Sequence, residues 1–344
     1  MKNLFLVLVI TLLIFSSSFS QNTDTSPRKE ILMPIPSWIK EGTCVVYSME
    51  VGSRVGIGAE SSAGVASGYH IYIVTTIQNN RVYGITYNLL RDSRSGEWIL
   101  NSNILLLNTP NAGLYLLPKV VEQVLKDREI YAQYGTIVEG GPIGKDLYYF
   151  AVTTQTQDEI TTTSEQFTSE GIIQRSTFTR KNPQGGEAGR KTLVGIYNLS
   201  FPTNLNFPEI GKRNVSYALY SVIMGITQPL SNVNLRFLNI EGNIANYQIS
   251  YYGRINQTST VIGDKIFGPY YINPVLLKRK PIISIPQIGF SIDTAGYAQS
   301  GGILVVLSLS GTPISQQVYD PNTGLLLEFI TPSAGFTTYG RLQN

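Results

Sequence analysis

The chain has 344 residues, of which 42% are hydrophobic and 14% charged, with a formal net charge of +3. So small a positive excess releases few counterions from a polyanion, so nucleic acid is not an expected partner. A single cysteine, Cys44, excludes an intramolecular disulfide, and a single histidine, His70, excludes metal sites built from two or more histidines.

The N-terminus has the pattern of a secretory signal peptide. Lys2 precedes the apolar run 4–15, and small residues follow over 16–20 at the expected cleavage position. This apolar run is well short of the ~20 residues that a membrane-spanning helix requires. We therefore predict a signal peptide over 1–20, a linker over 21–37, and no transmembrane segment in the mature chain. The expected location is secreted, extracellular or associated with the cell surface.

Two stretches far apart in the chain repeat one pattern in the same order. Residues 45–52 (VVYSMEVG) and 218–225 (ALYSVIMG) share Tyr, Ser and Gly at matching positions. The segment from Gly113 to Pro118 is echoed by 268–274 with one residue inserted. Repeats this long are typical of a duplicated domain rather than a solenoid. The sequence therefore predicts two related domains, 38–205 and 206–344.

Strand and turn patterns dominate both halves. The β-branched and aromatic runs 69–76 and 81–90 flank Asn79 and Asn80, and two similar runs flank Glu241, Gly242 and Asn243. Residues 52–68 are almost wholly Gly, Ala, Ser and Val, lack the spacing of a phosphate-binding loop, and favour a flexible loop between strands. The predicted fold class is mainly β: two related, duplicated domains of antiparallel curved sheet or sandwich, each with one short helix.

Each half contains one predicted helix that begins at a proline. Pro118 suits the first helical position of 118–128, whose valines and leucine share one face. The counterpart starts with Asn273 as N-cap and Pro274, and ends in three cations before Pro281. Cations at a helix C-terminus interact favourably with its dipole, and these could also contact anionic lipid headgroups.

One further hairpin is predicted in the later part of each half. The polar stretch 159–180 favours an exposed hairpin with no counterpart in the second half. Near the C-terminus, the Asp320 carboxylate can accept from a turn backbone, Pro321 presets the turn, and Gly324 supplies a positive φ.

Three ordered features carry a resemblance: residues 36–42 (PSWIKEG), a central helix that starts after a Tyr-to-Pro segment, and the terminal segment 319–326. In this set the chain resembles uncharacterised secreted β-rich proteins of archaea. That resemblance implies no activity and no catalytic residues. The layout is also similar in outline to the half-barrel lipoprotein-carrier fold, in which a curved sheet closes on helices around an apolar cavity.

No residue pattern indicates catalysis, so we predict no catalytic residues, metal ligands or cofactor, and a non-enzyme is favoured. The nucleophile elbow of serine hydrolases is absent, and His70 lies inside a strand pattern. Asp92 with Glu97, and Asp158 with Glu159, are sequence neighbours for which solvated surface is the better account. Three Asn-x-Ser/Thr triplets predict N-glycosylation of an exported chain, at Asn198, Asn214 and Asn256.

The leading hypothesis is a secreted, cell-surface-associated binding protein that holds an apolar ligand or lipid between sheet and helix. One alternative is a structural or adhesive component of the cell envelope. Another is an extracellular glycan hydrolase, which requires facing carboxylates ~5–10 Å apart. The sequence indicates neither the identity of a ligand nor the oligomeric state.

Overall fold

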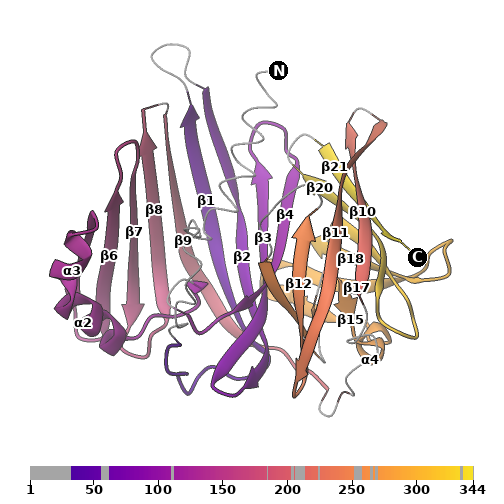
Figure 1. Cartoon of the computed structure of the whole chain (residues 1–344), viewed down its shortest axis with the longest axis horizontal. Helices are drawn as coiled ribbons and strands as arrows, with labels where there is room; N and C mark the ends of the chain where they lie inside the picture. The colour runs from indigo at the N-terminus through magenta and orange to yellow at the C-terminus, as the bar shows by residue number, and fades with distance from the viewer. Residues whose placement is uncertain are drawn as a thin grey trace.

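The computed structural model describes residues 32–55, 62–109, 112–183, 185–202, 205, 214–223, 225–251, 258–263, 266–267, 270–333 and 336–343. Within these ranges, two large antiparallel sheets account for most of the chain (Figure 1). The prediction of a mainly β chain is therefore confirmed. The predicted signal peptide and most of the predicted linker lie outside the described residues. No helix in the described part of the chain is long and apolar enough to cross a membrane.

The first sheet has nine described strands in the order β4-β3-β2-β1-β9-β8-β7-β6-β5. They are β1 (Thr43–Val55), β2 (Ser62–Gln78), β3 (Arg81–Asp92), β4 (Trp98–Leu106), β5 (Thr136–Pro142), β6 (Leu147–Gln155), β7 (Ile160–Thr168), β8 (Ile173–Asn182) and β9 (Gly185–Asn198). Two short helices, α2 (Pro118–Lys126) and α3 (Arg128–Ala132), connect β4 to β5.

The second sheet has ten described strands in the order β13-β12-β11-β10-β21-β20-β19-β18-β17-β16. They are β10 (Val215–Ile223), β11 (Ile226–Glu241), β12 (Ile244–Tyr251), β13 (Thr258–Gly263), β16 (Ile283–Ile285), β17 (Phe290–Tyr297), β18 (Ile303–Leu309), β19 (Thr312–Tyr319), β20 (Leu326–Ser333) and β21 (Phe336–Gln343). The small pair β14 (Ile266–Phe267) and β15 (Tyr271–Ile272), helix α4 (Pro274–Leu277) and the 3₁₀ turn η4 (Pro286–Ile288) lie between β13 and β17.

The two sheets share one topology. In each, the first strand lies centrally, the next three meander to one edge, a helical connection follows, and the chain returns to pair its last strand with the first. A tyrosine three residues before the first helix of each connection is bridged to a later hairpin turn, Tyr115 to Ile172 and Tyr271 to Leu325. Two related β domains with short helices are therefore confirmed, although the first also contains α3. Duplication as the origin, and the boundaries at 205 and 206, stay predictions.

Two predictions about individual segments are wrong. Most of 52–68 is not a loop, because β1 continues to Val55 and β2 begins at Ser62. Met49, Val51 and Ala66 pack there with Leu90 and Ile99, so small residues serve as strand positions. The hairpin over 159–180 is confirmed as β7 and β8, but it has a counterpart, because β19 and β20 take the same places in the second sheet.

The two predicted helices have different outcomes. Helix α2 begins at Pro118 as expected and buries Val121. In α4, the Asn273 side chain accepts from the Val275 amide at 2.9 Å, which confirms the N-cap. The helix ends at Leu277 with Lys278 as its C-cap, so Arg279 and Lys280 lie beyond it and the helix-dipole interpretation applies to Lys278 alone. A residue that precedes proline disfavours the helical conformation, which keeps Lys280, before Pro281, out of the helix.

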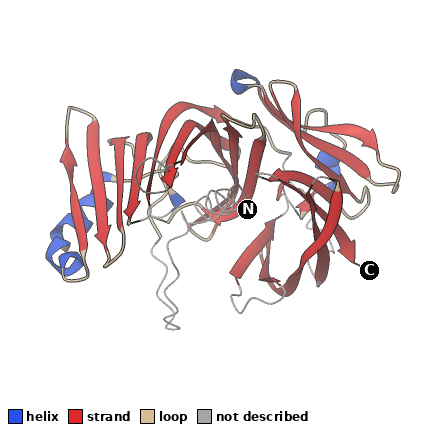
Figure 2. Ribbon diagram, turned by 90° about the horizontal axis from the view of Figure 1, so that it is seen from above, coloured by secondary structure: helices blue, strands red, loops and turns tan. Residues whose placement is uncertain are grey.

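The core lies on both faces of β1 to β3. Cys44 and Val46 point into a cluster shared with the second sheet, where Tyr87 meets Phe290 with ring centroids 5.5 Å apart. Val45 and Tyr47 point to the opposite face, which the 33–39 segment, residues 114–116 and α2 cover. Figure 2 shows the two curved sheets side by side. Burial raises the pKa of the Cys44 thiol to about 12, as expected of an inert core cysteine.

Equivalent hairpin tips of the two domains contact each other through Gln78. Its Nε2 donates to the Glu241 carbonyl at 2.6 Å, and its Oε1 accepts from the Asn243 amide at 3.0 Å. We expect Gln78→Ala to lower the free energy of unfolding by about 1–2 kcal/mol, because two inter-domain hydrogen bonds are lost. Urea unfolding should show this, with Gln155→Ala, at an exposed strand end, as the control. Equal effects of the two substitutions would contradict the prediction.

Candidate functional site

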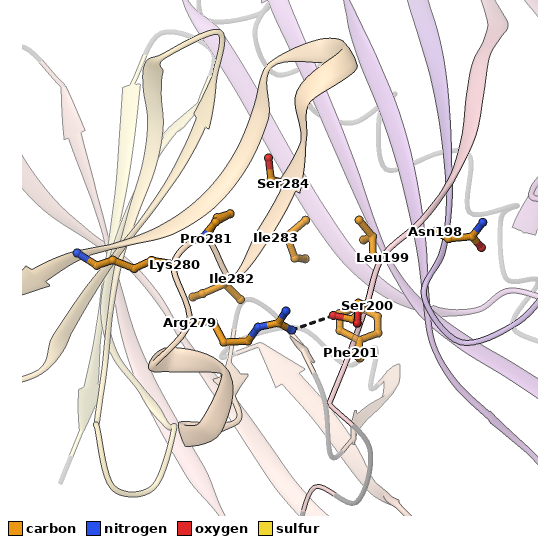
Figure 3. A pocket seen from close by; sticks show the side chains of 10 residues that line it. All are labelled: Asn198, Leu199, Ser200, Phe201, Arg279, Lys280, Pro281, Ile282, Ile283 and Ser284. Atoms are coloured by element: carbon orange, nitrogen blue, oxygen red, sulfur yellow. Dashed lines mark hydrogen bonds between the residues drawn. The ribbon is translucent and has the colours of Figure 1, made fainter.

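A groove lies between the two domains, where the end of β9 faces the segment that follows α4 (Figure 3). Its volume is about 430 Å³. One wall continues from β9 and the other leads from α4 into β16; the lining residues are Asn198, Leu199, Ser200, Phe201, Arg279, Lys280, Pro281, Ile282, Ile283 and Ser284.

The fold holds the second wall rigidly. Leu276 and Leu277 of α4 are buried, and Ile282 and Ile283 are also buried in the core shared by the two sheets. The Ile282 amide donates to the Ile292 carbonyl at 2.9 Å. Between these anchors the chain directs Arg279 across the groove, where its Nη1 donates to the Ser200 carbonyl at 2.8 Å. The groove walls are therefore joined by a charged hydrogen bond.

The chemistry of the groove is apolar and positively charged. Leu199, Phe201 and Ile283 supply apolar surface, and Figure 3 shows Arg279 directed into the groove while Lys280 points away from it. No Asp, Glu or His is among the lining residues. The groove thus offers a guanidinium for an anionic group.

A second cluster of polar residues lies on the helix-bearing face of the first sheet. His70 is buried and stacks on Tyr72, with ring centroids 4.2 Å apart, and Tyr72 meets Tyr47 edge-on. Burial lowers the pKa of His70 well below its usual value, and the charge of Lys191 adds to this effect. His70 is therefore neutral, and it lies in a strand as the sequence indicated.

Glu165 and Lys191 belong to the same face and were not recognised in the sequence. Through the strand register, Glu165 faces Ser176, Ser176 faces Lys191, and Lys191 faces Met49, two residues from Tyr47. Burial raises the pKa of Glu165 while Lys191 opposes this, and burial lowers the pKa of Lys191 while Glu165 opposes this. The alternation of side chains along the predicted strands within 159–180 could have indicated that Glu165 points inward.

Two of the four carboxylates considered in the sequence, Asp92 and Glu159, have structural roles. Oδ1 of Asp92 accepts from the amides of Arg94 and Ser95, both at 2.8 Å, and so holds a turn. Glu159 pairs with Arg180 at 2.6 Å. Burial raises the pKa of nearby Glu187 to about 7, with Arg180 opposing and Glu159 adding to the rise. Asp158 is exposed on the β6–β7 turn.

The predicted glycosylation sites differ in their surroundings. Asn198 is exposed at the end of β9 and lines the groove. Asn214 is exposed, although its Oδ1 accepts from the Phe237 amide at 2.9 Å. Asn256 lies outside the described residues. Glycosylation stays a prediction for all three. Among the described residues, no group of three or more His, Cys, Asp or Glu side chains could hold a metal ion.

Comparisons with known proteins do not indicate a function. No protein-family profile matches the chain, and no curated protein matches it. A protein of unknown function from the DUF3598 family of Nostoc punctiforme is similar at 10% identity, covering 87% of this chain and 95% of that one, with a TM-score of 0.15. Kievitone hydratase from Nectria haematococca is similar at 6% identity, covering 91% and 95%, also with a TM-score of 0.15. Likenesses at this TM-score carry no argument.

Proposed function

We propose that this protein is a secreted, cell-surface-associated binding protein that holds an apolar ligand with an anionic end, such as a lipid, in the groove between its domains. The observation that carries the proposal is the groove of about 430 Å³, in which Leu199, Phe201 and Ile283 surround a single inward-pointing cation, Arg279. Its volume is within the ~300–1,000 Å³ typical of ligand pockets.

The charge of the groove supports this assignment. A guanidinium can bind a carboxylate, sulfate or phosphate through two parallel hydrogen bonds, and the hydrogen bond from Arg279 to Ser200 uses Nη1 alone. The groove adjoins the segment that follows α4, where β9 ends, rather than lying between sheet and helix as expected from the sequence. Secretion rests on the pattern of residues 1–20.

Octyl sulfate and octyltrimethylammonium test the charge preference, since they share one tail and differ in the sign of the head. We expect calorimetric titration of the mature chain to detect octyl sulfate binding and much weaker binding of the cation. Arg279→Gln should weaken octyl sulfate binding about tenfold or more, because a charge-assisted hydrogen bond is lost.

Lys280→Gln is the matched control, because this neighbouring cation points away from the groove. It should change affinity by less than about threefold, as expected for a solvent-screened charge. Equal losses in the two variants would mean a diffuse surface charge rather than a groove site. Binding that is unaffected by either variant would contradict the proposal.

A further inference from the structure

Three polar side chains form a row across neighbouring strands of the first sheet, on the face opposite the second domain. His70 on β2 lies directly across from Asn88 on β3, and Asn88 lies across from Asn101 on β4. His70 and Asn88 are each 8% exposed. Nδ1 and Nε2 of His70, Oδ1 of Asn88 and Nδ2 of Asn101 are all buried and have no hydrogen-bond partner.

It is unusual for so many neighbouring buried polar atoms to lack hydrogen-bond partners. Most buried polar side-chain atoms in proteins are hydrogen-bonded, and each exception calls for an explanation such as a missing ligand. Four of the unpaired atoms, those of His70, Asn88 and Asn101, are adjacent in the strand register, whereas the unpaired Oγ1 of Thr76 lies further along β2. These four atoms therefore describe one site.

The unpaired atoms comprise equal numbers of donors and acceptors. Neutral His70 has one N–H donor and one acceptor nitrogen. Asn88 adds an acceptor through Oδ1, and Asn101 adds a donor through Nδ2. A carboxylate or phosphate accepts only, so it would leave the acceptors of His70 and Asn88 unpaired. A hydroxyl group both donates and accepts, and can satisfy either kind.

The row continues onto β1 with Tyr47, which lies across from His70. On one side the next row holds Tyr72, Thr86 and Asn103, and on the other side it holds the apolar Leu90 and Ile99. Leu90 and Ile99 pair directly with each other across β3 and β4. Such surroundings penalise a charged group and accept a hydrocarbon chain.

We infer that the row His70–Asn88–Asn101 is a second binding site, which takes the hydroxyl-bearing end of an uncharged amphiphile such as a glycolipid. The adjoining apolar residues contact its hydrocarbon part. This site is separate from the groove between the domains, and it takes an uncharged ligand rather than an anionic one.

We expect two changes in Asn88→Leu, one in ligand binding and one in thermal stability. This substitution keeps the side-chain size and removes the unpaired oxygen. Octyl glucoside should bind the mature protein and should bind this variant at least about tenfold more weakly. Without ligand, the variant should melt at the same temperature or about 2–4 °C higher, because a buried unsatisfied group is removed. His70→Phe, which preserves the ring stacked on Tyr72, should behave in the same way at pH 8.

Asn103→Leu is the matched control, because Asn103 is exposed on the same strand as Asn101. It should change neither octyl glucoside affinity nor the melting temperature. Binding of octyl sulfate in the groove should persist in Asn88→Leu and His70→Phe, and binding of octyl glucoside should persist in Arg279→Gln.

Three results would overturn the inference. One is octyl glucoside affinity that is unchanged in both row variants. Another is a clear fall in melting temperature for both, which would show that the polar atoms already have partners in solution. The third is no octyl glucoside binding to the unaltered protein. Each leaves the groove proposal standing, since that proposal depends on octyl sulfate and Arg279.

Discussion

Alanine at Gly324 is expected to lower the free energy of unfolding by about 3–5 kcal/mol, combining a left-handed backbone with overpacking. Gly324 has a φ of +74°, and an added Cβ would overlap the Ile272 carbonyl oxygen and approach the Tyr271 ring to 2.8 Å. The turn cannot move away easily, because the Ile272 amide donates to the Gly324 carbonyl at 3.0 Å. Urea unfolding followed by tyrosine and tryptophan fluorescence measures the effect.

Gly311→Ala provides the matched comparison. Gly311 has a similar φ of +78°, but an added Cβ would meet no atom within 4 Å. Its substitution should therefore cost only the left-handed conformation, about 1–2 kcal/mol. The difference between the two variants isolates the steric overlap at Gly324. If both variants lost the same stability, the packing argument would be wrong.

The Gly324 turn has a structural equivalent in the first domain. Gly171, with a φ of +85°, follows β7 and accepts from the Leu116 amide at 3.0 Å, just before α2 begins. Gly324 follows β19 and accepts from Ile272 just before α4. In both domains a glycine turn thus fastens the helical connection to the returning half of the sheet. This shared contact is a stronger sign of kinship than the short sequence echoes.

Turns were the part of the fold that the sequence predicted well, because a turn is decided by a few consecutive residues. Asn79 and Asn80 have φ values of 51° and 59°, as the hairpin between β2 and β3 requires. Gly242 supplies a positive φ between β11 and β12. Oδ1 of Asp320 accepts from the Asn322 and Thr323 amides at 2.7 and 2.8 Å, as expected.

Pairings between distant strands were not predictable in the same way. The small residues of 52–68 resemble a loop in isolation, and become strands because β3 and β9 supply partners on both sides. The strand register likewise brings Glu165 and Lys191 onto one face, although each lies in a polar stretch. Neither half of the chain indicates the packing of Tyr87 against Phe290, and the groove, which also lies between the two halves, was missed as well.

Acidification should reveal the buried neutral state of His70. Burial lowers the pKa of His70 in the folded protein. The unfolded chain is therefore protonated at His70 near pH 6.5, whereas the folded chain is not. This contribution to stability is therefore present above about pH 6.5 and is lost as pH falls, by up to about 1.4 kcal/mol per unit, until the folded pKa is reached. His70→Phe lacks the titrating group and should not show this loss.

The free energy of unfolding must be compared between the unaltered protein and His70→Phe at each pH. This is necessary because Glu187 changes stability in the opposite direction over the same pH range. Its pKa of about 7 means that the folded protein retains a proton that the unfolded chain has released, which favours folding as pH falls from about 7. Glu187 contributes equally to both proteins, so it cancels. Relative to pH 8, the unaltered protein should therefore lose up to about 2 kcal/mol more than His70→Phe at pH 5. Parallel stability curves from pH 8 to 5 would show that His70 has the same pKa in the folded and unfolded protein, and the assignment of His70 as a side chain that burial keeps neutral would then be wrong.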